Sequence, residues 1–270
     1  MITFVPTPIG NPKDITFRAI EIFQSADLFF CEDTRHTKHL ISILQERFGM
    51  KPIDAKFVSF NEHNGQSRLD EYGDILAKEQ IVYVSDAGMP VISDPGQLLV
   101  EYAQTHDIEY DVLPGGTAVA TAYAASGFED GKFLFFAFLP HKGKERAKSL
   151  NEALSCGYNV VLYESPHRLS KLLDEIVAID EHRELFLAKE LSKKYQNYYR
   201  DSAKNLQEKF ASIEIKGEWV VVIKAKEQEL NSISFDEIYS MDIPPKIKAK
   251  LLSSMSDKST KEWYNLLIKS

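Results

Sequence analysis

The sequence predicts an α/β protein made of two α/β lobes, followed by a small helical extension at its C-terminal end. Three observations predict this architecture. Short apolar runs alternate with stretches of helical periodicity as far as Lys226. The turn-forming sequence Pro114-Gly115-Gly116 interrupts this alternation near its middle, and the composition becomes polar after Lys226.

The first half of the chain is expected to form one sheet with helices on both faces. Its predicted strands are Thr3–Pro6, Ala26–Cys31, Phe57–Phe60, Ile81–Ser85 and Glu109–Leu113. Its predicted helices are Arg18–Gln24, Thr34–Arg47, Ser67–Lys78 and Gln97–Thr105. Strictly alternating strands and helices indicate βαβ units. Asp94-Pro95 is predicted to begin the last helix, with Asp94 as N-cap and Pro95 at the first helical position.

The second half repeats the alternation and is followed by the extension. Its predicted strands are Phe133–Phe138, Asn159–Tyr163, Glu184–Lys189 and Glu218–Ile223, and its predicted helices are Ala118–Ser126, Glu145–Leu154 and Leu169–Ala178. Two short helices are expected within Pro244–Ser270, separated near Ser256-Asp257-Lys258, with Ser259 or Thr260 capping the second. The predicted domains are therefore residues 1–115, 116–227 and 228–270, the last comprising a linker and the basic helical extension.

Composition excludes several classes of protein. With 44% hydrophobic and 27% charged residues, the chain has too much apolar content for a disordered protein. Its longest apolar run, Phe133–Leu139, is far shorter than the roughly 20 residues that a membrane helix needs. The N-terminus has no basic stretch before a hydrophobic segment, so no signal peptide is expected. Cys31 and Cys156 lack CxxC spacing, which favours a reduced, cytoplasmic protein without metal.

The charge is acidic overall but basic in two places. The net charge is −8, from 32 basic and 40 acidic residues, and this argues mildly against a general nucleic-acid binder. His141–Lys148 and the last thirty residues nevertheless each carry an excess of basic over acidic residues. The sequence is therefore compatible with local basic patches on the surface of an acidic protein.

Unusual residues follow the predicted strands of the first half. These loops begin at Thr7, Cys31, Asn61 and Asp86, and ligands of open α/β sheets bind at the carboxyl ends of strands. The densest of them is Ser85–Gly96 (SDAGMPVISDPG), which combines glycines, prolines and two aspartates. No GxGxxG or GxxxxGK[ST] motif occurs, so nicotinamide and P-loop sites lose their main support.

Seven segments occur in an order that resembles a known family. They are TPIGN, CEDTRHT, SDAGMPVISDPG, PGGTA, FLPHK, YESPHR and KGEWVVVI. Together they resemble the tetrapyrrole methylase (class III) superfamily of S-adenosylmethionine-dependent methyltransferases, over about residues 2–226. Within it, the chain looks like the members that methylate the ribose 2′-hydroxyl of a cytidine in the decoding centre of 16S rRNA in the small ribosomal subunit. The resemblance implies two lobes, with S-adenosyl-L-methionine in the cleft between them, and a homodimer.

The resemblance also implies a set of cofactor-binding positions. They are Pro8, Gly10, Asp86, Ala87, Gly88, Pro90, Ser93, Gly115, Thr117, Ala118, Leu139, Pro140, Tyr163, Pro166 and Gly217. For Pro140 and Gly217, turn geometry is an equally good explanation. The chain departs from the family pattern at several positions. Val91 and Ala137 stand where glycine is typical, Met89 where a small residue is typical, and Gln97, Gly116 and Lys189 replace an aromatic residue, proline and arginine.

Methyl transfer to a ribose hydroxyl requires alignment and a base or hydrogen-bond acceptor. The candidates are Glu32, Asp33, Arg35, His36, His63 and Arg168, with Glu62, Glu164 and His167 in the same segments. The CEDTRHT loop is favoured as a group over any one residue. Arg35 and Arg168 are suited to bind the target phosphate. A surface salt bridge is the alternative role of His36, and helix capping is the alternative role of Glu32 and Asp33.

Further basic and aromatic residues are candidates for RNA contacts. Tyr195, Tyr198 and Tyr199 lie near Lys193, Lys194 and Arg200, an arrangement that suits RNA stacking or an ordinary edge strand. The lysines of the extension suit phosphate binding or a solvated surface. Two alternatives to the RNA methyltransferase remain open: a methyltransferase of tetrapyrroles, and a non-catalytic RNA-binding protein that senses the cofactor.

Overall fold

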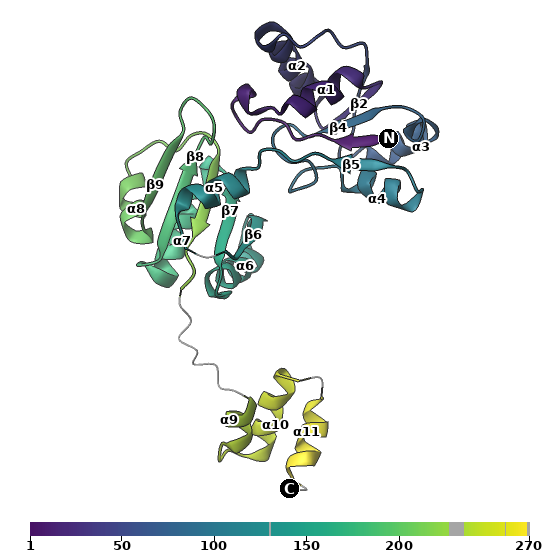
Figure 1. Cartoon of the computed structure of the whole chain (residues 1–270). Coiled ribbons are helices and arrows are strands. Elements are labelled where there is room, and N and C mark those ends of the chain that lie inside the picture. Colours follow the sequence, from purple (N-terminus) through teal and green to yellow (C-terminus); the bar gives the residue numbers. More distant parts are fainter. Residues whose placement is uncertain (130, 227–234, 257, 269–270) are drawn as a thin grey trace. The chain divides into compact units, whose positions relative to one another are not determined.

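The computed structural model describes residues 1–129, 131–226, 235–256 and 258–268. The chain divides into two compact units, residues 1–226 and residues 227–270. The first unit carries both sheets, and the second is helical (Figure 1).

The first sheet has five parallel strands in the order β3-β2-β4-β1-β5. They are β1 (Ile2–Phe4), β2 (Leu28–Cys31), β3 (Lys56–Ser59), β4 (Ile81–Val84) and β5 (Tyr110–Val112). The intervening helices are the short 3₁₀ helix η1 (Pro12–Asp14), α1 (Phe17–Ser25), α2 (Thr34–Phe48), α3 (Gly65–Leu76) and α4 (Gln97–Thr105). Parallel pairing confirms the βαβ prediction, and it brings the loops after these strands to one edge of the sheet.

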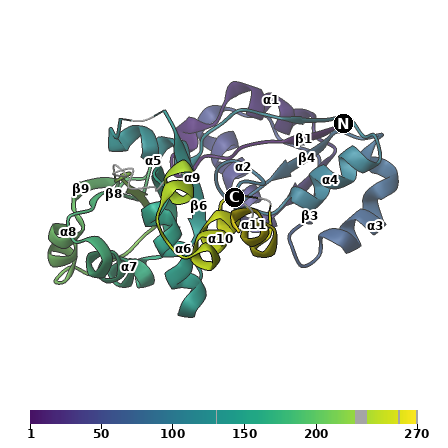
Figure 2. The ribbon, with the colours of Figure 1, turned by 90° about the horizontal axis from the view of Figure 1, so that it is seen from below.

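Both faces of this sheet are covered, as the apolar runs require. On one face, α1 and α2 pack against Phe29, Val82 and Val84. On the other face, α3 and α4 lie side by side and pack against Phe4, Phe30 and Tyr83 (Figure 2). All six of these strand side chains are fully buried.

The second sheet is mixed and has the order β6-β7-β10-β8-β9. Its strands are β6 (Phe133–Phe138), β7 (Asn159–Glu164), β8 (Glu184–Lys189), β9 (Asn197–Ser202) and β10 (Trp219–Ile223). Its helices are α5 (Ala118–Ser126), α6 (Gly143–Ser155), α7 (Pro166–Asp180) and α8 (Ala203–Phe210). One face packs on α6, α7 and α8, whereas α5 packs on the other. The prediction omitted α8, and it gave β9 only as the alternative to an RNA-binding segment.

Local sequence explains most helix ends, but one predicted cap is wrong. Asp33 caps α2, and Gly49 ends it in the left-handed region with φ of 69°. The N-cap of α4 is Gly96, not Asp94, and no side chain caps this helix. Gly96 has φ of 124°, and a Cβ there would lie 2.6 Å from the Tyr83 ring. The chain therefore turns at Gly96, and Asp94 lies outside the helix.

The second unit contains three short helices: α9 (Phe235–Ser240), α10 (Pro245–Ser254) and α11 (Thr260–Leu267). Ile238, Ala249, Leu252 and Trp263 form their buried cluster. Ser259 caps α11 in a capping box with Glu262, as predicted. The polar segment EQELNSISFDE, residues 227–237, is predicted as the linker, and this prediction is wrong for residues 235–237, which belong to α9. Its remainder, 227–234, lies outside the described residues, as does Asp257 between the two predicted helices.

The described residues contain no membrane-spanning helix, and they do not test the predicted domain boundaries. No helix in these ranges has the length and apolar character that a membrane span requires. The domain boundaries at residues 115, 116, 227 and 228 stay predictions, since residues 1–226 form a single compact unit.

Candidate functional site

The loops after β1 and β4 are tied together at the carboxyl edge of the first sheet. Thr7 and Gly88 form an isolated antiparallel bridge, with each backbone N–H donating to the other residue's carbonyl at 3.0 Å. Gly88 has φ of 87°, and a Cβ there would lie 3.3 Å from the side chain of Ile9. Glycine therefore provides both the backbone conformation and the space for this contact.

A cavity of about 330 Å³ lies between these loops and the second sheet. Its lining residues are Ile9, Ala87, Gly88, Met89, Ile92, Asp94, Thr117, Ala118, Phe138, Tyr163, Glu164, Ser165, Pro166, Ala188, Leu191, Glu218, Trp219 and Val220. Tyr163, Val220 and Ala188 are direct partners across β7, β10 and β8, so they form one row of the wall. A mostly apolar cavity of this size with a few polar groups is typical of a small-molecule site.

Part of the predicted cofactor set lines this cavity. These residues are Ala87, Gly88, Thr117, Ala118, Tyr163 and Pro166. Two parts of the lining were not predicted: Ile9, which lies between the predicted Pro8 and Gly10, and the start of β10. Trp219 and Val220 looked like ordinary core residues because they belong to an unbroken apolar strand. The available signal was their position in the KGEWVVVI segment, where only Glu218 separates them from Gly217.

The other predicted cofactor positions do not line the cavity. Several of the glycines allow close packing: a Cβ on Gly10, Gly115 or Gly217 would lie within 2.7 Å of an atom of Lys193, Pro6 or Glu190, respectively. The carbonyl groups of Leu139 and Pro140 accept hydrogen bonds from arginines. The remaining positions, Pro8, Asp86, Pro90 and Ser93, belong to the loops after β1 and β4. Their cofactor roles stay predictions.

The loop after β4 holds two non-glycine residues in the left-handed region. Val91 has φ of 72° and Ser93 has φ of 59°, and this conformation is unfavourable for a β-branched residue such as valine. Ala137, beside the register shift of β6, has φ of 51°. Val91 and Ala137 are the two positions where the family pattern has glycine. The backbone thus keeps the conformation that glycine favours, with strain of a kind often found near functional sites.

Asp94 lines the cavity and has an altered acidity. Burial, reinforced by the negative charge of Glu32, raises the pKa of Asp94 to about 6. Burial also raises the pKa of Tyr163 to about 12. A carboxyl group with a raised pKa beside a cavity is a good candidate for accepting a proton near neutral pH. The sequence analysis assigned Asp94 to a helix cap and so missed it.

The CEDTRHT loop meets the loop after β4 in a cluster of charged groups. The carboxylate of Glu32 accepts a hydrogen bond from the backbone N–H of Asp86 at 3.0 Å. His36 Nδ1 lies 2.8 Å from the carboxylate of Asp86, and this contact raises the pKa of His36. Burial raises the pKa of Glu32. Glu32, His36 and Asp86 therefore stand as one group of acid and base candidates.

Asp33 and Arg35 pair with each other in the same loop. Asp33 accepts hydrogen bonds from the backbone and the guanidinium group of Arg35, and the guanidinium bonds hold the pKa of Asp33 well below its usual range. Asp33 is also the N-cap of α2. His63 lies in the loop after β3, and its backbone N–H donates to Asn61 at 3.0 Å. No hydrogen bond or ion pair joins His63 to the Glu32 cluster in the described residues.

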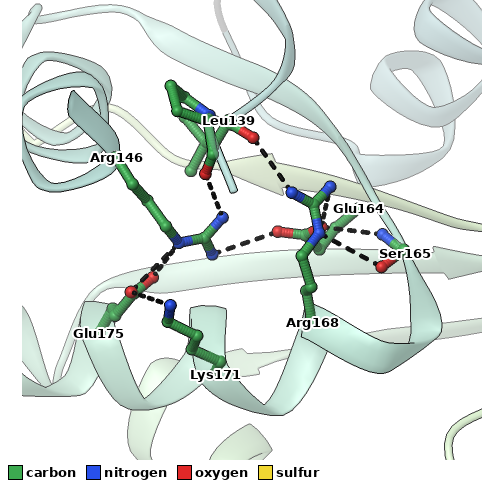
Figure 3. A network of polar contacts seen from close by, with 8 residues as sticks. Leu139, Arg146, Glu164, Ser165, Arg168, Lys171 and Glu175 are labelled. Carbon is green, nitrogen blue, oxygen red and sulfur yellow. Dashed lines mark hydrogen bonds and ion pairs between the residues drawn. The ribbon is translucent and has the colours of Figure 1, made fainter. Parts of the chain in front are cut away.

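Arg168 belongs to an ion-pair network around Glu164, a residue that also lines the cavity (Figure 3). Its guanidinium lies 2.8 Å from one oxygen of Glu164 and donates to the carbonyl of Leu139. Arg146 approaches the other oxygen of Glu164 at 3.3 Å and pairs with Glu175 at 2.8 Å. The side chains of Arg146 and Glu164 are each only 1% exposed. Since Arg168 already pairs with Glu164, its phosphate-binding role stays a prediction.

The structure divides the predicted RNA-contacting residues into two sets. Tyr195 and Tyr198 are exposed, and the ammonium group of Lys194 lies over the Tyr195 ring. Tyr199 instead packs against Phe210 and Trp219. Two of the cations are paired, Lys193 with Glu190 and Glu218, and Arg200 with Glu184. In the segment His141–Lys148, the guanidinium of Arg146 is buried and does not contribute to a surface patch.

No group of three or more His, Cys, Asp or Glu side chains in the described ranges has an arrangement that holds a metal ion.

Known proteins resemble this chain in sequence and in fold. Residues 1–207 match the family of tetrapyrrole (corrin/porphyrin) methylases. "Ribosomal RNA small subunit methyltransferase I" of Campylobacter fetus is 41% identical over 270 residues, covering 99% of this chain and 100% of the relative. The enzyme of that name from Thermotoga maritima is 40% identical and covers 84% of this chain and 99% of the relative.

Solved structures share the fold at much lower identity. The cobalt precorrin-4 methyltransferase CbiF matches with a TM-score of 0.61 at 17% identity, over 83% of this chain and 94% of that one. Uroporphyrin-III C-methyltransferase from Thermus thermophilus, solved with S-adenosylhomocysteine, matches with a TM-score of 0.54 at 14% identity, over 82% of this chain and 96% of that one. These structures confirm the predicted fold class, and the sequence matches show that the chain belongs to the tetrapyrrole methylase family.

Proposed function

We propose that this protein is an S-adenosylmethionine-dependent methyltransferase that modifies the ribose 2′-hydroxyl of a cytidine in 16S rRNA of the small ribosomal subunit. The observation that carries the proposal is the 41% identity to an rRNA methyltransferase along 99% of this chain. The tetrapyrrole enzymes that share the fold do so at less than 20% identity. The proposal extends to a cytoplasmic homodimer that works without a metal.

The cavity residues fit the methyl donor. The apolar row of Tyr163, Val220 and Ala188 suits an adenine ring, and the carboxylate of Asp94 suits a positively charged group. The bound donor supplies an electrophilic methyl group on a sulfonium sulfur. Thr117 and Ala118 begin α5 without a side-chain cap, so backbone N–H groups at this helix end can bind a polar edge of the donor.

The acid and base residues act on the acceptor hydroxyl. A ribose hydroxyl is a weak nucleophile at neutral pH, and a carboxylate that accepts its proton strengthens it. Asp94 has the position for this role because it lines the cavity, and its raised pKa lets it hold a proton near neutral pH. The carboxylates of Glu32 and of Asp86, the partner of His36, lie near Asp94, and their negative charges contribute to its raised pKa.

The second unit supports the choice of an RNA acceptor. Lys246, Lys250 and Lys261 are exposed on its helices, and exposed lysines bind phosphates with little sequence preference. The basic second unit therefore favours an RNA acceptor over a tetrapyrrole.

The deciding experiment follows radiolabelled methyl transfer from S-adenosylmethionine to small ribosomal subunits that lack the native modification. Naked 16S rRNA and a porphyrinogen serve as parallel acceptors. We expect label in the RNA, mapped to a cytidine ribose by nuclease digestion and mass spectrometry. Label only in the porphyrinogen would favour the tetrapyrrole enzyme. Tight cofactor binding with no label in any acceptor would favour the non-catalytic RNA-binding protein.

A further inference from the structure

A second cavity adjoins the first at Asp94. It also measures about 330 Å³, and it is lined by Phe60, Asn61, Glu62, Asp94, Pro95, Gly96, Gln97, Leu98 and Glu101. Among the described residues, Asp94 alone lines both cavities. The second cavity, called here the α4 groove, thus lies between the loop after β3 and the start of α4. A ligand that fills it extends toward the donor cavity past this shared carboxylate.

The groove has the charge of a site for a base rather than for a phosphate. Glu62, Asp94 and Glu101 are acidic, and no lysine or arginine is among the residues that line it. This negative lining repels a phosphate group. Carboxylate and amide oxygens are acceptors for an exocyclic amine, and Asp or Glu accepting from the N4 amine is a recurrent mode of cytosine recognition.

One side of the groove is apolar. Leu98 is 37% exposed although it is a large aliphatic side chain, and it stands in the first turn of α4 next to Gln97. Pro95 and Phe60 complete this wall. Enzymes that do chemistry on a base hold it out of the stack against aromatic or apolar side chains, and such side chains suit the base of a nucleotide whose ribose reacts as well.

A buried hydroxyl behind the wall lacks a partner. The hydroxyl oxygen of Tyr83 is buried and makes no hydrogen bond within the described residues, although a buried polar group ordinarily has a partner. The Tyr83 ring lies against two residues of the groove. Its centroid is 5.8 Å from the centroid of the Phe60 ring, and a Cβ on Gly96 would lie 2.6 Å from a carbon atom of the Tyr83 ring. Because no side chain caps α4, backbone N–H groups at the start of this helix, beside the groove, likewise have no side-chain acceptor.

We propose that the α4 groove binds the base of the acceptor cytidine, turned out of its stack, so that the ribose lies at Asp94 between the two cavities. Leu98 packs against the ring, Glu62 and Glu101 accept hydrogen bonds from the amine, and the N–H groups at the start of α4 donate to its carbonyl edge. This inference rests on the proposed function for the identity of the base, and it adds the place where that base binds.

The test combines nucleoside binding with methyl transfer on the full chain. The double variant Leu98→Ala/Glu62→Gln alters two exposed groove residues, and Leu134→Ala is the matched control because Leu134 is 38% exposed on the edge strand β6. Saturation-transfer NMR with free cytidine and uridine is the first readout. We expect cytidine to receive at least fivefold more saturation than uridine from the wild-type chain and from Leu134→Ala, with the double variant losing this signal.

The second readout is the KM for unmodified small subunits, together with calorimetry of S-adenosylmethionine binding. The double variant should raise the KM at least tenfold and leave cofactor affinity within twofold of wild type. A normal KM in the double variant, or equal saturation of cytidine and uridine in the wild-type chain, overturns the groove assignment while RNA labelling by wild type upholds the proposed function. If the wild-type chain labels no RNA, the proposed function itself fails, whatever the nucleosides do.

Discussion

His36 Nδ1 lies 2.8 Å from Oδ2 of Asp86, and this contact joins the first turn of α2 to the loop after β4. The hydrogen bond, with the attraction of the Asp86 charge, raises the pKa of His36 above its ordinary value of about 6.5. The pair is exposed to solvent, so its chief consequence is the charge that it holds at the edge of the site.

The first prediction concerns that pKa. Replacing Asp86 by Asn should lower the pKa of His36, because the neutral amide favours the imidazolium less strongly. A raised folded-state pKa means that the contact stabilises the fold fully below the unfolded-state pKa, and that this effect is lost as the pH rises through the folded-state value. An NMR titration of the histidine Cε1 protons measures the shift. Asp111→Asn, which removes the partner of Arg18 instead, should leave His36 unchanged, and an unchanged His36 in Asp86→Asn would contradict the pairing.

The second prediction concerns the strained backbone at Ala137. With φ of 51°, alanine is less favourable there than glycine by about 1 kcal/mol. We expect Ala137→Gly to raise the free energy of unfolding by about 0.5–1 kcal/mol in a urea titration. The control is Ala178→Gly in the exposed part of α7, which should lower it by about 1 kcal/mol. Destabilisation at both positions would show that Ala137 carries no such strain.

The third prediction tests the buried network of Figure 3. Arg146→Met removes one cation from Glu164, whose carboxylate is 1% exposed. Leaving a buried charge without its partner typically costs about 3–5 kcal/mol of unfolding free energy. Because Arg168 still pairs with Glu164 at 2.8 Å, we expect a loss at the lower end of this range, about 3 kcal/mol. Lys171→Met is the matched control, because Lys171 is half exposed and lies 3.7 Å from Glu175, which predicts a loss below about 1 kcal/mol. Similar losses in the two variants, measured by urea denaturation, would mean that Arg146 is dispensable.

The fourth prediction places the donor in the first cavity. Ala118 lines that cavity at the start of α5, whereas Ala120 lies exposed on the same helix. Ala118→Leu adds bulk to the cavity and should weaken S-adenosylmethionine binding at least tenfold, which corresponds to about 1.4 kcal/mol. Ala120→Leu makes the same change in side chain away from the cavity and should bind normally. Calorimetry that finds equal affinities would remove α5 from the donor site.

Sequence periodicity predicted most of the first unit because its strands and helices bury regular apolar patterns. The parallel sheet, with its loops gathered at one edge, followed from the alternation alone. Local rules were less reliable where tertiary packing decides the outcome. Asp94-Pro95 has the sequence of a helix start, yet the chain turns at Gly96 over the Tyr83 ring and leaves Asp94 at the cavity. The residues next to Gly96 in the sequence do not indicate that the Tyr83 ring packs against it.

The basic segment His141–Lys148 shows a second limit of sequence reasoning. Its four cations look alike in the sequence, but Arg146 is buried between Glu164 and Glu175, which come from β7 and α7. Only the fold brings these carboxylates to one side of α6. The family resemblance identified the loops of the cavity, yet it pointed to glycines such as Gly115, which packs against the Pro6 ring, and it missed the wall residue Trp219.

The last prediction concerns the second unit. Truncation after Lys226 removes residues 227–270, a separate compact unit, so S-adenosylmethionine binding by the first unit should persist. RNA affinity should fall, and its dependence on salt should become less steep, because each lost phosphate contact reduces the slope of log K against log salt by about 0.7–0.9. Replacing the exposed Lys246, Lys250 and Lys261 by Gln in the full chain should reduce that slope by about 2 and leave the helices intact. Filter binding to 16S rRNA at several salt concentrations measures the slope, with circular dichroism as the control for folding. A slope that stays the same in both variants would assign the second unit to packing or dimerisation instead of phosphate binding.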